Sequence, residues 1–132
     1  MNTSISKISP QLENLLNKFA KELVKDDHSF KYVVGNSTND AFLLRLYLSF
    51  QKKSCEEEVV VSIDIQNQND LIVINSDACA DDGSFIVENI AVSIPANAEP
   101  IIFDAFLREW SITFEDFLIN SSSKIKRAVE AM

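Results

Sequence analysis

The spacing of the apolar residues changes twice along this 132-residue chain, and those changes restrict the fold more than any other feature. From Ile8 to Val24 the apolar residues recur at helical spacing, from Phe30 to Ile94 they mostly alternate with polar ones, and from Pro100 the helical spacing returns. A period of 3.6 indicates an amphipathic helix, and a period of two indicates a half-buried strand. The sequence therefore predicts a helix, a series of strands and then helices.

The first helix is expected to begin at Ser9 and Pro10 and to end near Asp26. A serine hydroxyl can cap the first turn, and proline needs no N–H there. The polar residues 26–29 then break the helical period, so they mark the end of the helix.

About five strands are expected between the helices. Leucines dominate 42–50, which makes a helix the competing interpretation there, but the clean alternation favours a strand. The polar residues 67–70 form a tight connection that predicts an antiparallel hairpin. Turns or loops are expected at 35–40, 51–57 and 75–84. The strands are expected at 30–34, 42–50, 58–66, 71–74 and 86–94.

The last third of the sequence is typical of helices that lie on a sheet. An aromatic stripe at alternating spacings of four and three begins at Phe103 and ends at Phe117. Residues 111–113 interrupt good helix formers, so a kink or a break is expected there, and a final helix is expected from Ser122.

Together these elements predict one domain over 1–132 with an α+β fold. An N-terminal helix precedes a meander sheet of about five mostly antiparallel strands, and two to three C-terminal helices pack on one face of the sheet. Two glycines in the whole chain argue against a glycine-rich phosphate-binding α/β fold.

Charge argues against some classes of partner. The net charge is −8, and the sequence between Asp70 and Asp116 contains ten carboxylates and a single cation, Arg108. Such a surface repels phosphate backbones and anionic lipid, so we expect neither a nucleic acid nor a membrane as partner. The first eight residues lack the apolar run of a signal peptide, which predicts a cytoplasmic protein.

No residue pattern points to catalysis, a metal or a cofactor. His28 is the only histidine, and it follows the expected helix end, where a solvated imidazole is typical. Cys55 and Cys79 lie in expected loops, lack the close spacing of a redox pair and are interpreted as free thiols. The segment from Asp77 to Glu88 has the length of an EF-hand calcium loop, but its third position is Cys79 and its glycine is one place late.

Two groups of residues are candidates for binding a partner. On the face of strand 42–50 opposite its leucines lie Leu43, Arg45 and Tyr47, a composition that is enriched at protein interfaces. On the C-terminal helices, Phe106 and Trp110 belong to an aromatic stripe whose apolar arc is wider than one sheet face needs. The alternatives are an ordinary surface strand and core packing, respectively.

The order of the elements resembles that of the type III secretion chaperone-like proteins, and the similarity is greatest over 90–95 and 103–117. The resemblance implies a curved antiparallel sheet that holds an extended segment of a partner, and it allows a homodimer. The sequence departs from that fold because it has no clear helix between its middle strands, and no functional residue is carried over.

Three functions follow from these observations. The first is a non-enzymatic protein-binding module, chaperone-like or an adaptor, with a protein partner. The second is an immunity or antidote protein whose acidic surface blocks the basic site of a toxin. The third is a small-molecule-binding domain with a pocket between sheet and helices.

Overall fold

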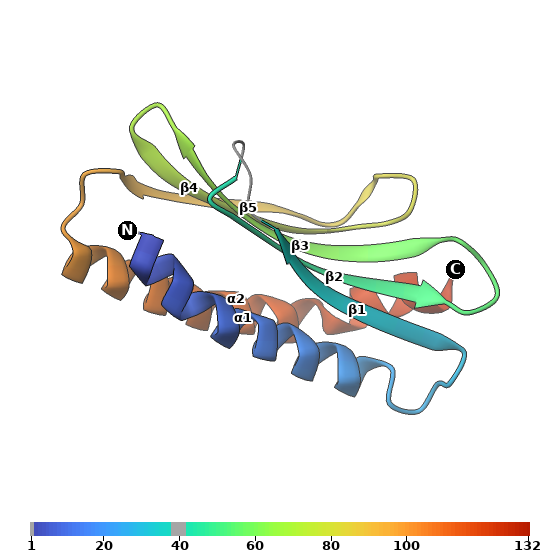
Figure 1. Cartoon of the computed structure of the whole chain (residues 1–132). Coiled ribbons are helices and arrows are strands. Elements are labelled where there is room, and N and C mark those ends of the chain that lie inside the picture. The colour runs from blue at the N-terminus through green and yellow to red at the C-terminus, as the bar shows by residue number, and fades with distance from the viewer. Residues whose placement is uncertain (1, 38–41) are drawn as a thin grey trace.

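The computed structural model describes residues 2–37 and 42–132 and has an α+β fold, as the sequence predicts (Figure 1). A first helix, five strands and a second helix follow one another along the chain. Their bounds are α1 (Asn2–Leu23), β1 (Phe30–Ser37), β2 (Leu44–Lys52), β3 (Glu58–Gln68), β4 (Leu71–Cys79), β5 (Phe85–Pro95) and α2 (Pro100–Glu130).

The sheet is an antiparallel meander in which strand order follows chain order, β1-β2-β3-β4-β5. Each strand pairs antiparallel with the next one. Both helices lie on the same face of the sheet and run in the same direction (Figure 1). The other face of the sheet is not covered by either helix.

The core lies between the sheet and the helices because the apolar residues of the strands alternate toward α1 and α2. Leu46, Leu48, Ile63 and Ile74 are fully buried there. Burying one such side chain contributes about 1.5–3 kcal/mol, so the central strands β2 to β4 supply much of the driving force for folding. At the edge of the sheet, the side chain of Asn36 on β1 donates a hydrogen bond to Glu13 of α1.

Helix α1 begins at Asn2, so the predicted start at Ser9 and Pro10 is wrong. Ile5 and Ile8 in the preceding turns are buried in the core. Their burial outweighs the hydrogen bond that Pro10 removes from the helix interior. The helix ends at Leu23, three residues before the predicted end.

Strands β1 and β4 extend furthest beyond the ends that their apolar alternation indicates, and β2 and β3 continue to Lys52 and Gln68, two residues past theirs. Strand β1 continues to Ser37, although 35–37 were predicted as a turn; the rest of that turn, 38–40, lies outside the described residues. Strand β4 continues to Cys79 because Ser76 and Ala78 face the core, where they are buried. Cys79 therefore lies in a strand and not in a loop.

The C-terminal third is one helix, so the prediction of two to three helices is wrong. The hydroxyls of Ser111 and Thr113 donate to the carbonyl oxygens of Arg108 and Glu109, at 2.8 Å and 3.2 Å, and leave the backbone helical. Buried residues continue on both sides of this point, which stabilises an unbroken helix; they are Phe103, Leu107, Trp110, Phe114, Phe117, Leu118, Ser121, Ile125 and Val129.

Candidate binding face

The candidate site is the face of the sheet that points away from the helices. Strand register places its side chains in rows that cross neighbouring strands. Most of them are half-buried, since the side chains of adjacent strands shield one another. We call this surface the open face; its central residues are Arg45, Tyr47, Ser49, Val60, Ser62, Asp64, Val73, Asn75, Asp77 and Cys79.

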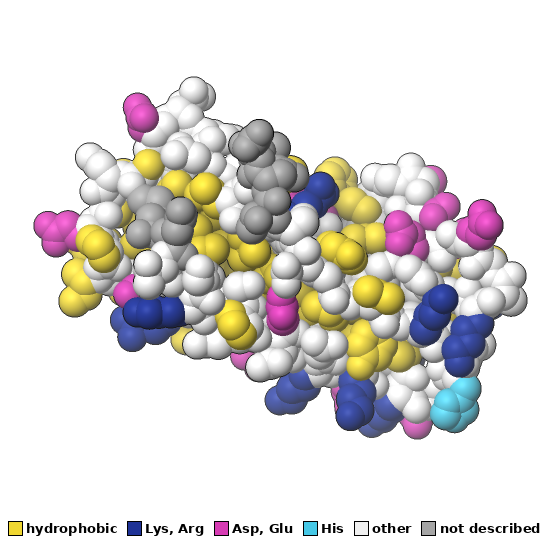
Figure 2. Space-filling model, viewed as in Figure 1, with side chains coloured by type: hydrophobic (Ala, Val, Ile, Leu, Met, Phe, Trp, Pro, Cys, Tyr) yellow, Lys and Arg dark blue, Asp and Glu magenta, His cyan; other side chains and the backbone are white. Residues whose placement is uncertain are grey.

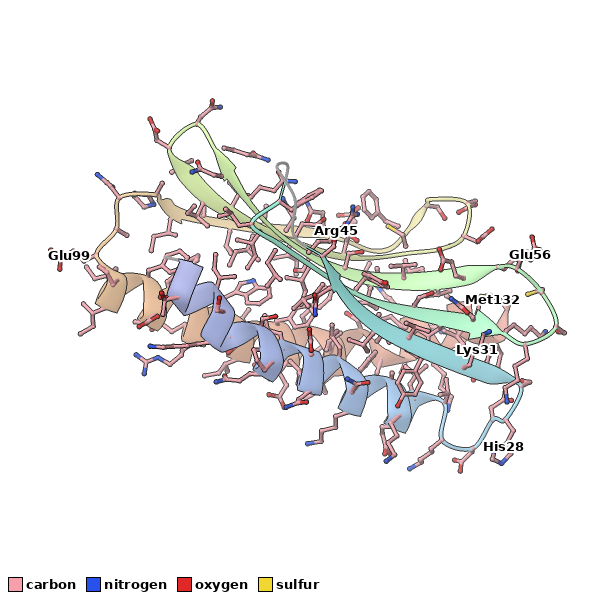
Figure 3. The ribbon with its side chains drawn as sticks, in the orientation of Figure 1. His28, Lys31, Arg45, Glu56, Glu99 and Met132 are labelled. Atoms are coloured by element: carbon pink, nitrogen blue, oxygen red, sulfur yellow. The ribbon has the colours of Figure 1, made fainter. Side chains whose placement is uncertain are left out.

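An ion pair joins two strands in the first row of the open face. Arg45 on β2 lies directly opposite Asp64 on β3, and Arg45 Nε is 3.0 Å from Asp64 Oδ1. The approach does not meet the angular requirement of a hydrogen bond, and Oδ1 is buried with no other hydrogen-bond donor among the described residues. The guanidinium also lies 4.9 Å from the ring centroid of Phe42, within cation–π distance. Figure 3 shows Arg45 on the side of the sheet opposite the helices.

The next row carries a second carboxylate, Asp77, and the thiol of Cys79 lies beside it in the row after. Cys79 Sγ lies 3.7 Å from Asp77 Oδ1, close enough for a weak hydrogen bond. Burial raises the pKa of Asp64 and of Asp77, although Arg45 partly opposes the rise in both. Burial also raises the pKa of the Cys79 thiol, and the carboxylate of Asp77 raises it further. The thiol therefore stays protonated at neutral pH, which makes it a poor nucleophile.

Apolar groups lie at both edges of the third row. Val33 on β1 is 45% exposed and Phe85 on β5 is 57% exposed. Between them lie Ser49 and Val60, which are directly paired across β2 and β3. The hydroxyl of Ser49 donates to Glu58 Oε2 at 2.6 Å. A row that is apolar at its exposed ends and hydrogen-bonded near its centre can contact a partner without leaving its own polar atoms unpaired.

The structure brings together only part of the predicted binding set. Arg45 and Tyr47 lie on the open face, as alternation indicated. Leu43 precedes β2, donates its N–H to Ile65 O at 2.8 Å and packs against the core. Trp110 is 5% exposed in the core, where its ring stacks on Phe114 at 5.2 Å. Phe106 is half-buried and also packs against the core.

Asp77 and Cys79 belong to the open face but were missed as parts of it by the sequence reasoning. The signal that could have found them is weak. Ser76 and Ala78 alternate with them and occupy core positions. Small residues at such positions do not stand out as an apolar stripe. Asp64 is easier to place from the sequence, because it alternates with Ile63 and Ile65, which mark the core face of the strand.

Other sequence candidates lie away from the open face or contribute no chemistry to it. His28 is exposed in the turn between α1 and β1 (Figure 3). Cys55 is an exposed free thiol in the connection between β2 and β3. In the rejected calcium-like segment, Asp82 Oδ1 instead accepts hydrogen bonds from the backbone N–H and hydroxyl of Ser84. These bonds lower the pKa of Asp82.

The described part of the chain, 2–37 and 42–132, holds no group of three or more His, Cys, Asp or Glu side chains arranged to bind a metal ion. Neither of its two helices combines the length and apolarity needed to cross a bilayer. No protein-family model matches the sequence, and neither a curated protein nor a solved structure matches it significantly.

Proposed function

We propose that this chain is a non-enzymatic protein-binding module, chaperone-like or an adaptor, that holds a segment of a partner protein against the open face. The observation that carries the proposal is the asymmetry of the sheet. Both helices cover one face, and the other exposes half-buried side chains of mixed character. A surface of this kind gains from a partner because the exposed apolar side chains at its edges leave water on binding.

The chemistry of the open face indicates what kind of segment it would accept. Val33, Val60 and Phe85 offer apolar contacts along one row. Asp77 has no ion pair among the described residues, and a cation from a partner would favour its charged form. An extended segment with apolar side chains and a lysine or arginine would therefore complement this face, in line with the net charge of −8.

Site-specific photo-crosslinking in the native host tests this function. A photoreactive phenylalanine analogue replaces Val60 on the open face, and the matched control carries it at Asn97, which is exposed in the connection between β5 and α2. We expect Val60 to capture a distinct protein partner and Asn97 not to. Asp77→Asn in the Val60 background should reduce capture about tenfold, because it removes the charge that a lysine or arginine of the partner would meet, with the fold verified by circular dichroism. Equal capture from both positions, or capture that Asp77→Asn leaves unchanged, would contradict the proposal.

The second candidate function is an immunity or antidote protein, and one local observation favours it. The β2–β3 and β4–β5 loops meet at one end of the sheet, where the N–H of Glu58 donates to Asp81 Oδ1 at 3.1 Å. This contact gathers Glu56, Glu57 and Asp82 at the same end, where Figure 2 shows carboxylates clustered. Electrostatic steering by this end would make association with a basic toxin fall steeply with salt. An association rate that is independent of salt would exclude this candidate.

The third candidate, a small-molecule-binding domain, has less support. Its pocket was expected between the sheet and the helices. Phe50, Phe103 and Phe114 are almost completely buried in that layer and pack as core. Close packing of this kind leaves little room for a ligand.

A further inference from the structure

A cleft of about 410 Å³ lies between α1 and α2, on the side of the helices that faces away from the sheet. Leu15, Phe19, Leu23 and Leu118 supply much of its apolar lining. The helix pair thus exposes an apolar groove in addition to the open face on the opposite side of the molecule.

Helix α2 also exposes isoleucines beside this cleft. Ile119 lines it and is 61% exposed, and Ile112 is 65% exposed. Seven residues make nearly two helical turns, so both side chains point to the same side of α2. Trp110, Phe114 and Phe117 occupy the opposite, buried side. The outer surface of the helix pair therefore has the protruding apolar groups and the groove that an interface needs.

Charge separates this helix surface from the rest of the molecule. The two helices together carry seven basic and seven acidic side chains, so the net charge of −8 resides in the strands and connections. Figure 2 shows lysine and arginine side chains along the lower edge, on the helix layer. Two copies that met through their helices would bring neutral layers together and keep their acidic parts apart.

The charged residues at the rim of the cleft have a self-complementary order. Along α1 a cation precedes an anion, Lys18 then Glu22, whereas along α2 an anion precedes a cation, Glu115 then Lys126. A two-fold axis that crosses the middle of the cleft, perpendicular to the helices, places a second copy antiparallel to the first. Lys18 then faces Glu22 of the second copy, and Glu115 faces Lys126 of the second copy. Each of these pairs occurs twice.

This arrangement also suits the helix dipoles and the available area. The parallel α1 and α2 have dipoles that add, and an antiparallel copy opposes them. With 22 and 31 residues, the helices are about 33 and 46 Å long and present an outer face on the order of 700–900 Å². That area is comparable to the roughly 800 Å² that each partner contributes to a standard interface.

We propose that the outer face of the helix pair is a homodimer interface, in which a second copy lies antiparallel across the α1–α2 cleft and buries Ile112 and Ile119. The proposal is independent of the proposed function, because both open faces point outward in such a dimer. Loss of the dimer would therefore leave capture at Val60 intact, and failure of that capture would leave the dimer intact.

Charge reversal with rescue tests the geometry of the interface. Sedimentation velocity over a concentration series measures the dimer dissociation constant of the full chain. We expect Glu115→Lys and Lys126→Glu each to raise it about tenfold, and the double variant that swaps both charges to restore it within about threefold. Ile119→Asp should raise it a hundredfold or more, while Phe85→Asp on the open face, equally exposed, leaves it unchanged.

Several results would overturn the proposal. They are a wild-type chain that stays monomeric at hundreds of micromolar, a dimer that Ile119→Asp leaves intact, and a dimer that Phe85→Asp disrupts equally. A swapped variant no better than the single variants would reject the antiparallel pairing. Both substituted apolar side chains are largely exposed, so folding should survive, and thermal unfolding of each variant checks this.

Discussion

The ring of Tyr47 on β2 lies over Gly35, its direct cross-strand neighbour on β1, and occupies the space that a side chain at 35 would need. A Cβ added to Gly35 would overlap the Cζ and Oη atoms of Tyr47. Glycine inside a strand costs roughly 0.5–1 kcal/mol relative to alanine. At this position the tyrosine ring compensates, because it packs on the bare backbone of the edge strand.

This relationship predicts that the effect of Gly35→Ala changes sign with the residue at 47. In the wild-type chain we expect the free energy of unfolding to fall by about 1 kcal/mol, because the ring is displaced. In a Tyr47→Ala background the same change should raise it by about 0.5–1 kcal/mol, since only the strand preference remains. Urea unfolding of the wild-type chain, the two single variants and the double variant measures the coupling between positions 35 and 47. Additive effects would show that the ring does not rest on Gly35.

The fold was predictable wherever apolar residues alternate strongly, and less so where small residues replace them. Strand β3 alternates valine and isoleucine with polar residues and begins where the sequence placed it, although it continues to Gln68, two residues into the predicted turn. In β4, Ser76 and Ala78 fill core positions without an apolar signal, because a serine and an alanine do not stand out in an alternating pattern. The position of Asp77 and Cys79 on the open face could not be predicted for the same reason.

The break predicted in the last helix failed for a different reason. Local propensity at 111–113 is weak, but Trp110 and Phe114 pack into the core on either side of these residues. Tertiary packing outweighs a propensity difference of a few tenths of a kcal/mol per residue. The candidate residues on that helix were ambiguous from sequence because an aromatic stripe looks the same in a core and at an interface.

Asp77 should make stability depend on pH in the direction opposite to that of an ion-paired carboxylate. Burial raises its pKa in the folded chain above that of the unfolded chain, so the folded state binds more protons between the two values. The stability that Asp77 contributes is therefore present below the unfolded pKa and is lost as pH rises through the folded pKa. Asp77→Asn removes this loss. In urea unfolding at neutral pH we expect Asp77→Asn to be as stable as the wild-type chain or more stable. Between mildly acidic and neutral pH, its free energy of unfolding should fall less than that of the wild-type chain.

The matched control for this experiment is Asp116→Asn, at an exposed position on α2. It should leave the pH dependence of the wild-type chain in place. Two results would show that burial of Asp77 does not control how the free energy of unfolding depends on pH. One is an equal change of that dependence by Asp77→Asn and Asp116→Asn, and the other is a steeper dependence in Asp77→Asn.

Arg45→Met should destabilise the chain more at neutral than at acidic pH. The guanidinium opposes the rise in the pKa of Asp64, so its removal raises that pKa further. The chain then loses more stability as pH rises through the folded-state pKa of Asp64, and this loss is absent below the pKa of Asp64 in the unfolded chain. Since Arg45 is 45% exposed, the loss at neutral pH should be modest, about 1 kcal/mol.

The double variant Arg45→Met with Asp64→Asn identifies the cause. It should recover most of the stability at neutral pH, because no charged carboxylate is left without its cation. Differential scanning calorimetry at two pH values measures the wild-type chain, Arg45→Met and the double variant. A loss from Arg45→Met that is the same at both pH values would mean that packing against Phe42, and not the charge on Asp64, is what Arg45 contributes.

Trp110 and Ile112 lie two residues apart on α2, and we expect their truncation to affect different properties. Trp110 is 5% exposed and stacks on Phe114, whereas Ile112 is 65% exposed. Trp110→Ala leaves a cavity in the core and should lower the free energy of unfolding by about 3–5 kcal/mol. Ile112→Ala should lower it by less than about 0.5 kcal/mol in the monomer and act mainly on the dimer constant. Because a dimer is also stabilised by its own association, both unfolding measurements belong at concentrations where the chain is monomeric. A small stability change for Trp110→Ala together with loss of association would place Trp110 in an interface, as one of the two sequence-based interpretations held.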